Sequence, residues 1–133
     1  DRLARRGLQH EPACVFCSQH AQTLHHLLVD CVFTRIIWHG ILSWCCPTIT
    51  APDESLGFFD WLSVAMLQLP QDRRQGLSTI ALLTAWSIWR CRNAIIFDKA
   101  TPSTASLLAA IQDDARSRAY AGARGLSAII PAG

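Results

Sequence analysis

Four cysteine and histidine side chains near the start of the chain have the types and the spacing of metal ligands. Two cysteines separated by two residues can hold a zinc ion from one tight turn, and Cys14 and Cys17 form such a pair in the segment CVFC. The segment HLLVDC supplies His26 and Cys31, which a short helix and its end can place together. The pattern C-x2-C-x8-H-x4-C therefore predicts a tetrahedral zinc site with three thiolates and one imidazole.

Other interpretations of these residues stay open at this point. The cysteines can be small hydrophobic residues of a reduced core, or a redox pair, although a redox CxxC motif needs a βαβ setting that the sequence does not offer. His25 lies beside His26 and can be the ligand instead, because helix geometry does not separate them. The remaining thiols lie outside the pattern, with Cys45 and Cys46 expected at the core-facing end of a helix and Cys91 alone.

Short amphipathic helices are the elements that must position these ligands. Apolar residues recur at helical spacing through most of the chain, and no alternating strand pattern of useful length is present. Thr23 is expected to cap the first helix through its hydroxyl. The spacing predicts helices over residues 24–30, 34–44, 56–69, 71–97 and 102–121. The predicted fold class is therefore all-α, a small domain of four to five helices with an N-terminal zinc knuckle.

The domain organisation follows from the position of the ligands. Residues 1–46 are predicted to be a zinc-binding module, and residues 47–133 a helical region that packs on it within the same domain. Thr101 followed by Pro102 predicts the start of the last helix, a capping hydroxyl and then proline in the first turn. Two glycines interrupt the helical pattern after that helix, so the C-terminal tail is expected to be loose.

Composition and charge exclude several classes of protein. The chain has 133 residues, of which 50% are hydrophobic, so it can bury a core, unlike a disordered tail. Its net charge of +2 does not by itself indicate a nucleic-acid binder, although eleven of the twelve basic residues are arginine, whose forked donors suit phosphate. No stretch reaches the roughly 18 apolar residues of a membrane span. No secretory signal opens the chain, so six reduced cysteines are expected.

Several segments resemble the reverse-transcriptase zinc-binding domain of plant LINE-type (non-LTR) retrotransposons. The run DRLARRGL, the pair CVFC and the segment TLHHLLVDC followed by VFTRIIW are similar to the start of that family, and WSIWRCRNAIIFD is similar to its later IW..RN..IF segment. Gln22 and Cys91 depart from the family, which usually has Glu at the first position and often at the second, but neither is a predicted ligand. The family spacing favours His26 over His25 as the third ligand.

The resemblance implies a module that lies C-terminal to the polymerase in a longer polyprotein. The expected partners are RNA or single-stranded DNA and the reverse-transcriptase part of the same polyprotein, without a membrane, in the nucleus or the cytoplasm. An enzyme is not expected, because four ligands close the zinc site and no polymerase-like catalytic pair is present. Asp113 and Asp114 are adjacent but lie in a predicted helix.

Basic residues around the predicted knuckle are the candidates for contacts with nucleic acid. They are Arg2, Arg5, Arg6, His10 and Arg35. Such residues bind phosphate in a salt-dependent way, and Phe16 or Phe33 can stack on an unpaired base. The competing interpretation is a solvated helix face for the arginines and a core position for both rings. Two other functions stay open: a protein-interaction or scaffold domain in which zinc only stabilises the fold, and a decayed element fragment without function.

Overall fold

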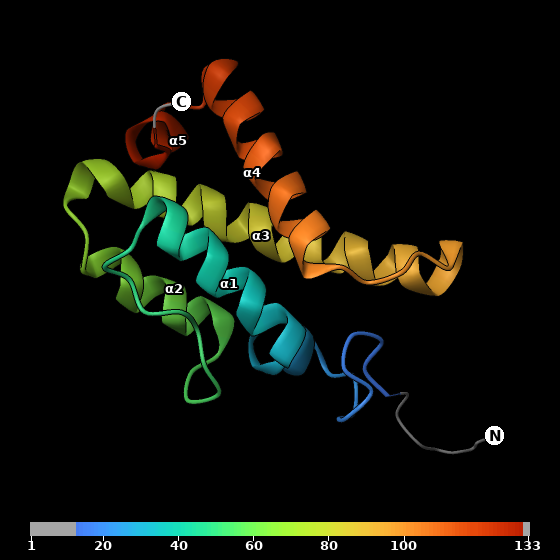
Figure 1. Cartoon of the computed structure of the whole chain (residues 1–133). Helices are drawn as coiled ribbons and strands as arrows, with labels where there is room; N and C mark the ends of the chain where they lie inside the picture. The colour runs from blue at the N-terminus through green and yellow to red at the C-terminus, as the bar shows by residue number, and fades with distance from the viewer. Residues whose placement is uncertain (1–12, 132–133) are drawn as a thin grey trace.

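The structure, a computed structural model, describes residues 13–131 as a set of packed helices (Figure 1). In chain order the helical elements are the π-helix η1 (His26–Asp30), α1 (Val32–Cys45), α2 (Phe58–Leu67), α3 (Gln71–Asp98), α4 (Thr104–Tyr120) and α5 (Arg124–Ile129). The described residues contain no strand, only an isolated bridge between Ala13 and Ala21. The predicted all-α fold is therefore confirmed. None of the helices in this part of the chain is long and apolar enough to cross a membrane.

α1 carries the first part of the core and holds the segment that precedes it. Its apolar residues recur every three or four positions, so one face is buried: Phe33, Ile37, Trp38, Ile41, Leu42 and Cys45. Trp38 donates its Nε1–H to the carbonyl oxygen of Leu28 at 2.6 Å. Thr34 donates its hydroxyl to the carbonyl oxygen of Leu27, also at 2.6 Å. Both hydrogen bonds join α1 to η1, so the turn that carries His26 is anchored to the core.

α3 is the central helix, and it contacts η1, α2, α4 and α5. The fully buried residues along it are Leu77, Ile80, Ala81 and Ile88, with Thr84 beside them. Its C-terminal end extends beyond α1 in Figure 1. Aromatic side chains on this half are exposed, with 54% of Trp86 and 74% of Phe97 open to solvent. One face of the helix therefore contributes to the core as far as Ile88, and aromatic side chains on its later part face solvent.

The start of α4 differs from the prediction. The helix begins at Thr104, and its N-cap is Ser103, whose hydroxyl accepts a hydrogen bond from the backbone N–H of Ser106 at 3.2 Å. The expected cap, Thr101, lies before the helix together with Pro102. Serine and threonine can both cap a helix, and the sequence alone does not tell which hydroxyl accepts the hydrogen bond from the backbone N–H.

The C-terminal tail is a short helix rather than the loose segment that was expected. α5 packs against α3 and α4, and Leu126 and Ile129 are buried. α5 comes close to α3 because both helices have glycine at the contact: a Cβ on Gly76 would overlap the carbonyl oxygen of Gly125. Gly125, one of the two glycines that suggested a loose tail, therefore allows α5 to approach α3 closely.

Candidate metal centre

A tight turn places Cys14 and Cys17 on the same side of the N-terminal loop. The N–H of Cys14 donates to the carbonyl oxygen of His20, and the N–H of Ser18 donates to that of Cys14, both at 2.8 Å. Ser18 has a φ of 59°, a left-handed conformation that reverses the chain directly after Cys17. The N–H of Gln19 points at the sulfur of Cys17 at 3.5 Å. The turn therefore directs both thiols toward the following helical segment.

The second pair of ligands comes from the capped helical turn that ends in η1. Thr23 accepts the backbone N–H of His26 on its hydroxyl at 3.0 Å, as an N-cap residue does. The N–H of Cys31 then donates to the carbonyl oxygen of His26 at 2.8 Å, which closes the wider turn of a π-helix. Residues five apart in a regular α-helix point about 140° away from each other, so the wider turn helps His26 and Cys31 face one point.

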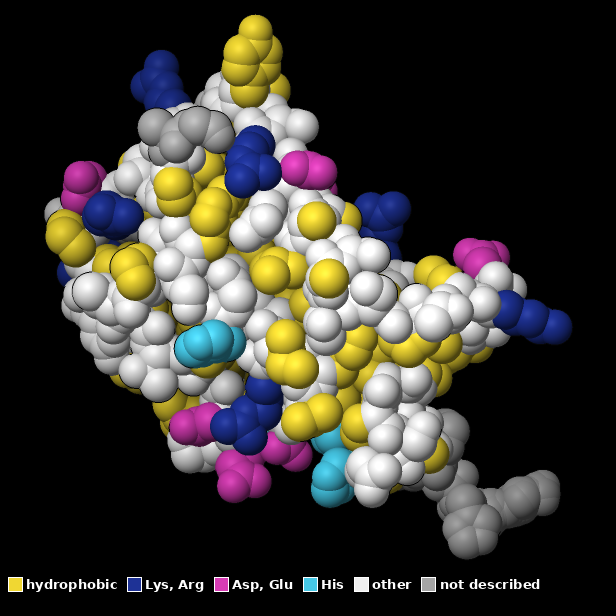
Figure 2. Space-filling model, in the orientation of Figure 1, with side chains coloured by type: hydrophobic (Ala, Val, Ile, Leu, Met, Phe, Trp, Pro, Cys, Tyr) yellow, Lys and Arg dark blue, Asp and Glu magenta, His cyan; other side chains and the backbone are white. Residues whose placement is uncertain are grey.

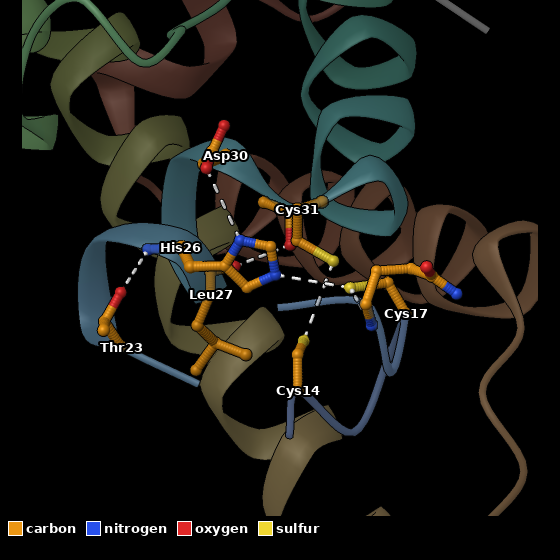
Figure 3. Close-up of polar contacts among 9 residues, drawn as sticks. Cys14, Cys17, Thr23, His26, Leu27, Asp30 and Cys31 are labelled. Carbon is orange, nitrogen blue, oxygen red and sulfur yellow. Dashed lines mark hydrogen bonds and ion pairs between the residues drawn. The ribbon is translucent and has the colours of Figure 1, made fainter. Parts of the chain in front are cut away.

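The four predicted ligands meet at one point (Figure 3). Their ligand atoms, three Sγ and one histidine nitrogen, all lie within 4.8 Å of one another. The Sγ atoms of Cys14 and Cys31 are 3.8 Å apart, and Cys17 Sγ lies 3.4 Å from His26 Nε2. Tetrahedral bonds of zinc length would separate two sulfurs by about 3.8 Å, and a sulfur and a nitrogen by about 3.5 Å. These four residues are therefore positioned to bind a metal ion.

The ligands differ in their exposure to solvent. Cys14, Cys31 and His26 are buried, with 1%, 0% and 4% of their surfaces exposed, and Cys17 is half-buried. Burial raises the pKa of the Cys31 thiol to about 12. Burial also opposes ionisation of Cys17, but hydrogen bonds from the Gln19 backbone and His26 outweigh it and lower the pKa of that thiol to about 7. A dication at the centre would stabilise all three thiolates.

The neighbouring histidines and cysteines do not enter the cluster. His25 is exposed and is not one of the four residues of the cluster. His20 is also exposed, although its ring centre lies 5.0 Å from that of His26. Cys45 and Cys46 are buried at the end of α1, as predicted. All six cysteines of the chain are free thiols.

Arg92 supplies a contact between the ligand loop and α3 that the sequence did not reveal. With the Gln22 side-chain amide oriented so that its oxygen faces α3, that oxygen accepts hydrogen bonds from Arg92 Nη2 at 3.1 Å and Nε at 3.3 Å. The Arg92 guanidinium also lies over the ring of Trp89, 4.8 Å from its centre. Trp89 and Arg92 both lie in the segment WSIWRCRNAIIFD of α3. Their position indicates that this segment helps to support the ligand loop.

Arg35 is the one predicted nucleic-acid contact that the structure describes; the predicted contacts Arg2, Arg5, Arg6 and His10 lie outside the described residues. Arg35 is exposed and lines a cleft of about 410 Å³ together with Asp30 and Glu54. Hydrogen bonds from Ser55 and, to a smaller extent, the charge of Arg35 lower the pKa of the nearby Asp53 carboxyl. Three acidic side chains thus line the clefts that Arg35 lines, and their negative charge lowers the positive potential near this arginine.

The two aromatic rings near the knuckle pack against each other. The rings of Phe16 and Phe33 are stacked with centroids 4.3 Å apart and planes 4° from parallel. Phe33 is buried and Phe16 half-buried. The rings therefore serve the packing of the ligand loop on α1, which was the competing interpretation for both of them.

Comparison with known proteins agrees with the geometry of the cluster. Residues 1–38 match the family model described as zinc-binding in reverse transcriptase. No curated protein and no solved structure matches the chain. The matched segment includes all four residues of the cluster and ends within α1. The match supports a reverse-transcriptase zinc-binding segment in residues 1–38 of this chain.

Proposed function

We propose that Cys14, Cys17, His26 and Cys31 bind one zinc ion as a closed structural site. The observation that carries this proposal is the set of four ligand atoms within 4.8 Å, contributed by two separate segments. Three thiolates and a neutral imidazole suit zinc better than a hard cation such as Mg²⁺. A catalytic zinc keeps one position open for water, whereas four protein ligands leave none. The proposed module is therefore non-catalytic.

The zinc ion would hold the N-terminal loop against the helices. The loop that carries Cys14 and Cys17 contributes little to the core besides the ligands themselves and Phe16. Binding to a site that exists only in the folded state supplies folding free energy. We include the predicted division in this proposal, with residues 1–46 as the zinc-binding module and residues 47–133 as the helical region that supports it.

The module is proposed to assist the binding of RNA or single-stranded DNA by a reverse transcriptase polyprotein of a plant LINE element, in the nucleus or the cytoplasm. The sequence places Arg2, Arg5 and Arg6 shortly before the first ligand. On the face drawn in Figure 2, the described basic and acidic side chains are mixed rather than separated by sign. Because Arg35 also has acidic neighbours, we expect the three N-terminal arginines to contribute most of the phosphate contacts.

A salt titration tests this role. Fluorescence anisotropy would follow the binding of the zinc-loaded chain to a labelled single-stranded RNA and DNA at several salt concentrations. Arg5→Ala with Arg6→Ala should weaken binding and reduce the slope of log affinity against log salt by about 1.4, since each lost contact to a single strand contributes about 0.7. The matched control, Arg116→Ala with Arg118→Ala, removes two arginines that pair with acidic residues on α4.

The control should change binding little, because those arginines are already partly neutralised within their own helix. Equal losses for both double variants would indicate a general effect of charge. Unchanged binding in the Arg5→Ala, Arg6→Ala variant would contradict the nucleic-acid role and favour the second candidate function.

The second candidate is an interaction domain that contacts the reverse-transcriptase part of the same polyprotein. The observation that favours it is exposed apolar surface on the second half of α3, where Trp86, Trp89 and Phe97 are 54%, 36% and 74% exposed. Figure 2 shows hydrophobic side chains along the projecting end of the molecule. Exposed apolar residues close together are typical of protein interfaces. Such an interface would bind with little dependence on salt, which separates it from the first candidate.

A further inference from the structure

We propose that Asp30 orients His26 for the metal by accepting a hydrogen bond from the second ring nitrogen, Nδ1. This inference rests on the proposed metal site and adds a positioning residue to it. The pattern of Cys and His ligands assigns no role to Asp30, which is not one of the four residues of the cluster.

The geometry separates the two nitrogens of the ring. His26 Nε2 faces the cluster, 3.4 Å from Cys17 Sγ, whereas Nδ1 faces the Asp30 carboxylate, with 3.6 Å between Nδ1 and Oδ2 (Figure 3). The two residues are four apart, a spacing at which side chains on one helical face meet. Figure 3 draws Asp30 and Cys17 on opposite sides of the imidazole. The carboxylate is therefore where a partner of the metal-bound ring would lie.

The buried Nδ1 atom needs such a partner. Within the described residues it is buried and has no hydrogen bond at normal distance. A neutral imidazole carries a proton on one nitrogen and a lone pair on the other. Metal binding requires the lone pair at Nε2, so the proton lies on Nδ1, where an unpaired donor would destabilise the fold.

The Asp30 carboxylate can accept a hydrogen bond from Nδ1 after a small movement. A movement of about 0.7 Å would bring its oxygen to the usual distance of a charge-assisted hydrogen bond. The side chain is 32% exposed, so the carboxylate keeps part of its hydration while it approaches the ring. Partners of this kind fix the tautomer and the orientation of metal-binding histidines and make the ring a better donor.

Two alanine variants test the role of Asp30 against a matched control. Asp30→Ala removes the proposed acceptor, and Glu54→Ala removes another carboxylate that lines the same cleft. Zinc affinity is measured for both by competition with a chromophoric chelator. We expect Asp30→Ala to bind zinc about 10- to 100-fold more weakly than the natural chain, and Glu54→Ala to bind within about twofold of it.

A spectroscopic readout separates positioning from general stability. The ¹⁵N shifts of His26 in the zinc-loaded chain should report a protonated, hydrogen-bonded Nδ1, and Asp30→Ala should shift the Nδ1 signal while far-UV circular dichroism stays the same. Asp30→Asn keeps a neutral acceptor and should lie between the natural chain and Asp30→Ala in affinity. If Asp30→Ala does not fold, the Asp30→Asn variant carries the test.

The outcomes distinguish this inference from the metal site itself. A natural chain that binds no zinc contradicts the proposed site. A natural chain that binds zinc, with Asp30→Ala or Asp30→Asn unchanged in affinity and in the Nδ1 signal, overturns only the role of Asp30. Equal losses in Asp30→Ala and Glu54→Ala also overturn it, because they would reflect charge near the site rather than a hydrogen bond.

Discussion

Replacing His26 with alanine tests the ligand assignment against a control at the adjacent residue. His26 is 4% exposed and its Nε2 lies 3.4 Å from Cys17 Sγ. His25 is exposed and outside the cluster. The two substitutions remove the same side chain one position apart, so they change composition and charge equally. Only their positions relative to the proposed metal differ.

The expected effect follows from the number of ligands. Structural zinc sites contribute about 10–16 kcal/mol of binding free energy in small zinc-finger peptides. One of four ligands therefore contributes about 2.5–4 kcal/mol if the ligands share this energy equally, which corresponds to roughly 100- to 1,000-fold in affinity. His26→Ala should lose affinity in this range. His25→Ala should change the free energy of binding by no more than about 0.5 kcal/mol, as surface substitutions do.

The assay is a zinc competition titration at fixed pH under reducing conditions, with a chelator whose absorbance changes on binding zinc. Far-UV circular dichroism of each variant reports whether the helices remain. Equal losses in both variants would refute the assignment of His26. A larger loss in His25→Ala would show that the neighbouring histidine is the ligand.

Two further predictions concern the thiols. Cys17→Ser should loosen the N-terminal segment while the core around Trp38 and Ile80 stays packed, because the site joins the loop to η1. Amide hydrogen exchange should therefore become faster only before residue 32. Unchanged exchange throughout the chain would contradict this prediction. Zinc affinity should fall as pH falls, because the ligands must lose protons to bind. Zinc binding releases a proton from Cys31 at every pH near neutrality, because a pKa of about 12 keeps the metal-free thiol protonated there. Zinc binding releases a proton from Cys17 only below its pKa of about 7, because above that pH the metal-free side chain is already a thiolate. The pH dependence should therefore become steeper below about pH 7, and calorimetry in buffers of different ionisation enthalpy would refute this if the number of released protons were constant.

The ligand set and most helices follow from short-range patterns. The spacing of Cys14, Cys17, His26 and Cys31 brings the four side chains together because a tight turn and a capped helical turn have few alternatives. Thr23 caps as predicted, and its cap is local in sequence. α1 and α3 begin and end within about two residues of their predicted bounds, since long apolar repeats leave little freedom.

Other features depend on contacts that are distant in sequence. α5 packs closely on α3 because Gly76 and Gly125 leave room at the contact, and no local pattern near residue 125 reveals the partner. The support of Gln22 by Arg92 joins residues 70 positions apart. The π turn at His26 includes a hydrogen bond from the N–H of Cys31 to the carbonyl oxygen of His26, and residue propensities do not predict this wider turn. The sequence shows that Asp30 follows His26 by four residues. The proposed role of Asp30 depends on the burial of Nδ1 of His26, which only the structure reveals.

The most direct measurement is the metal content of the purified, reduced chain by elemental mass spectrometry, with reactive thiols counted before and after chelation. The account predicts one zinc per chain and three additional reactive thiols after chelation, from Cys14, Cys17 and Cys31. Cys45 and Cys46 should remain protected by burial in both states. A chain without zinc whose reactive thiols do not change on chelation would contradict the proposed metal site.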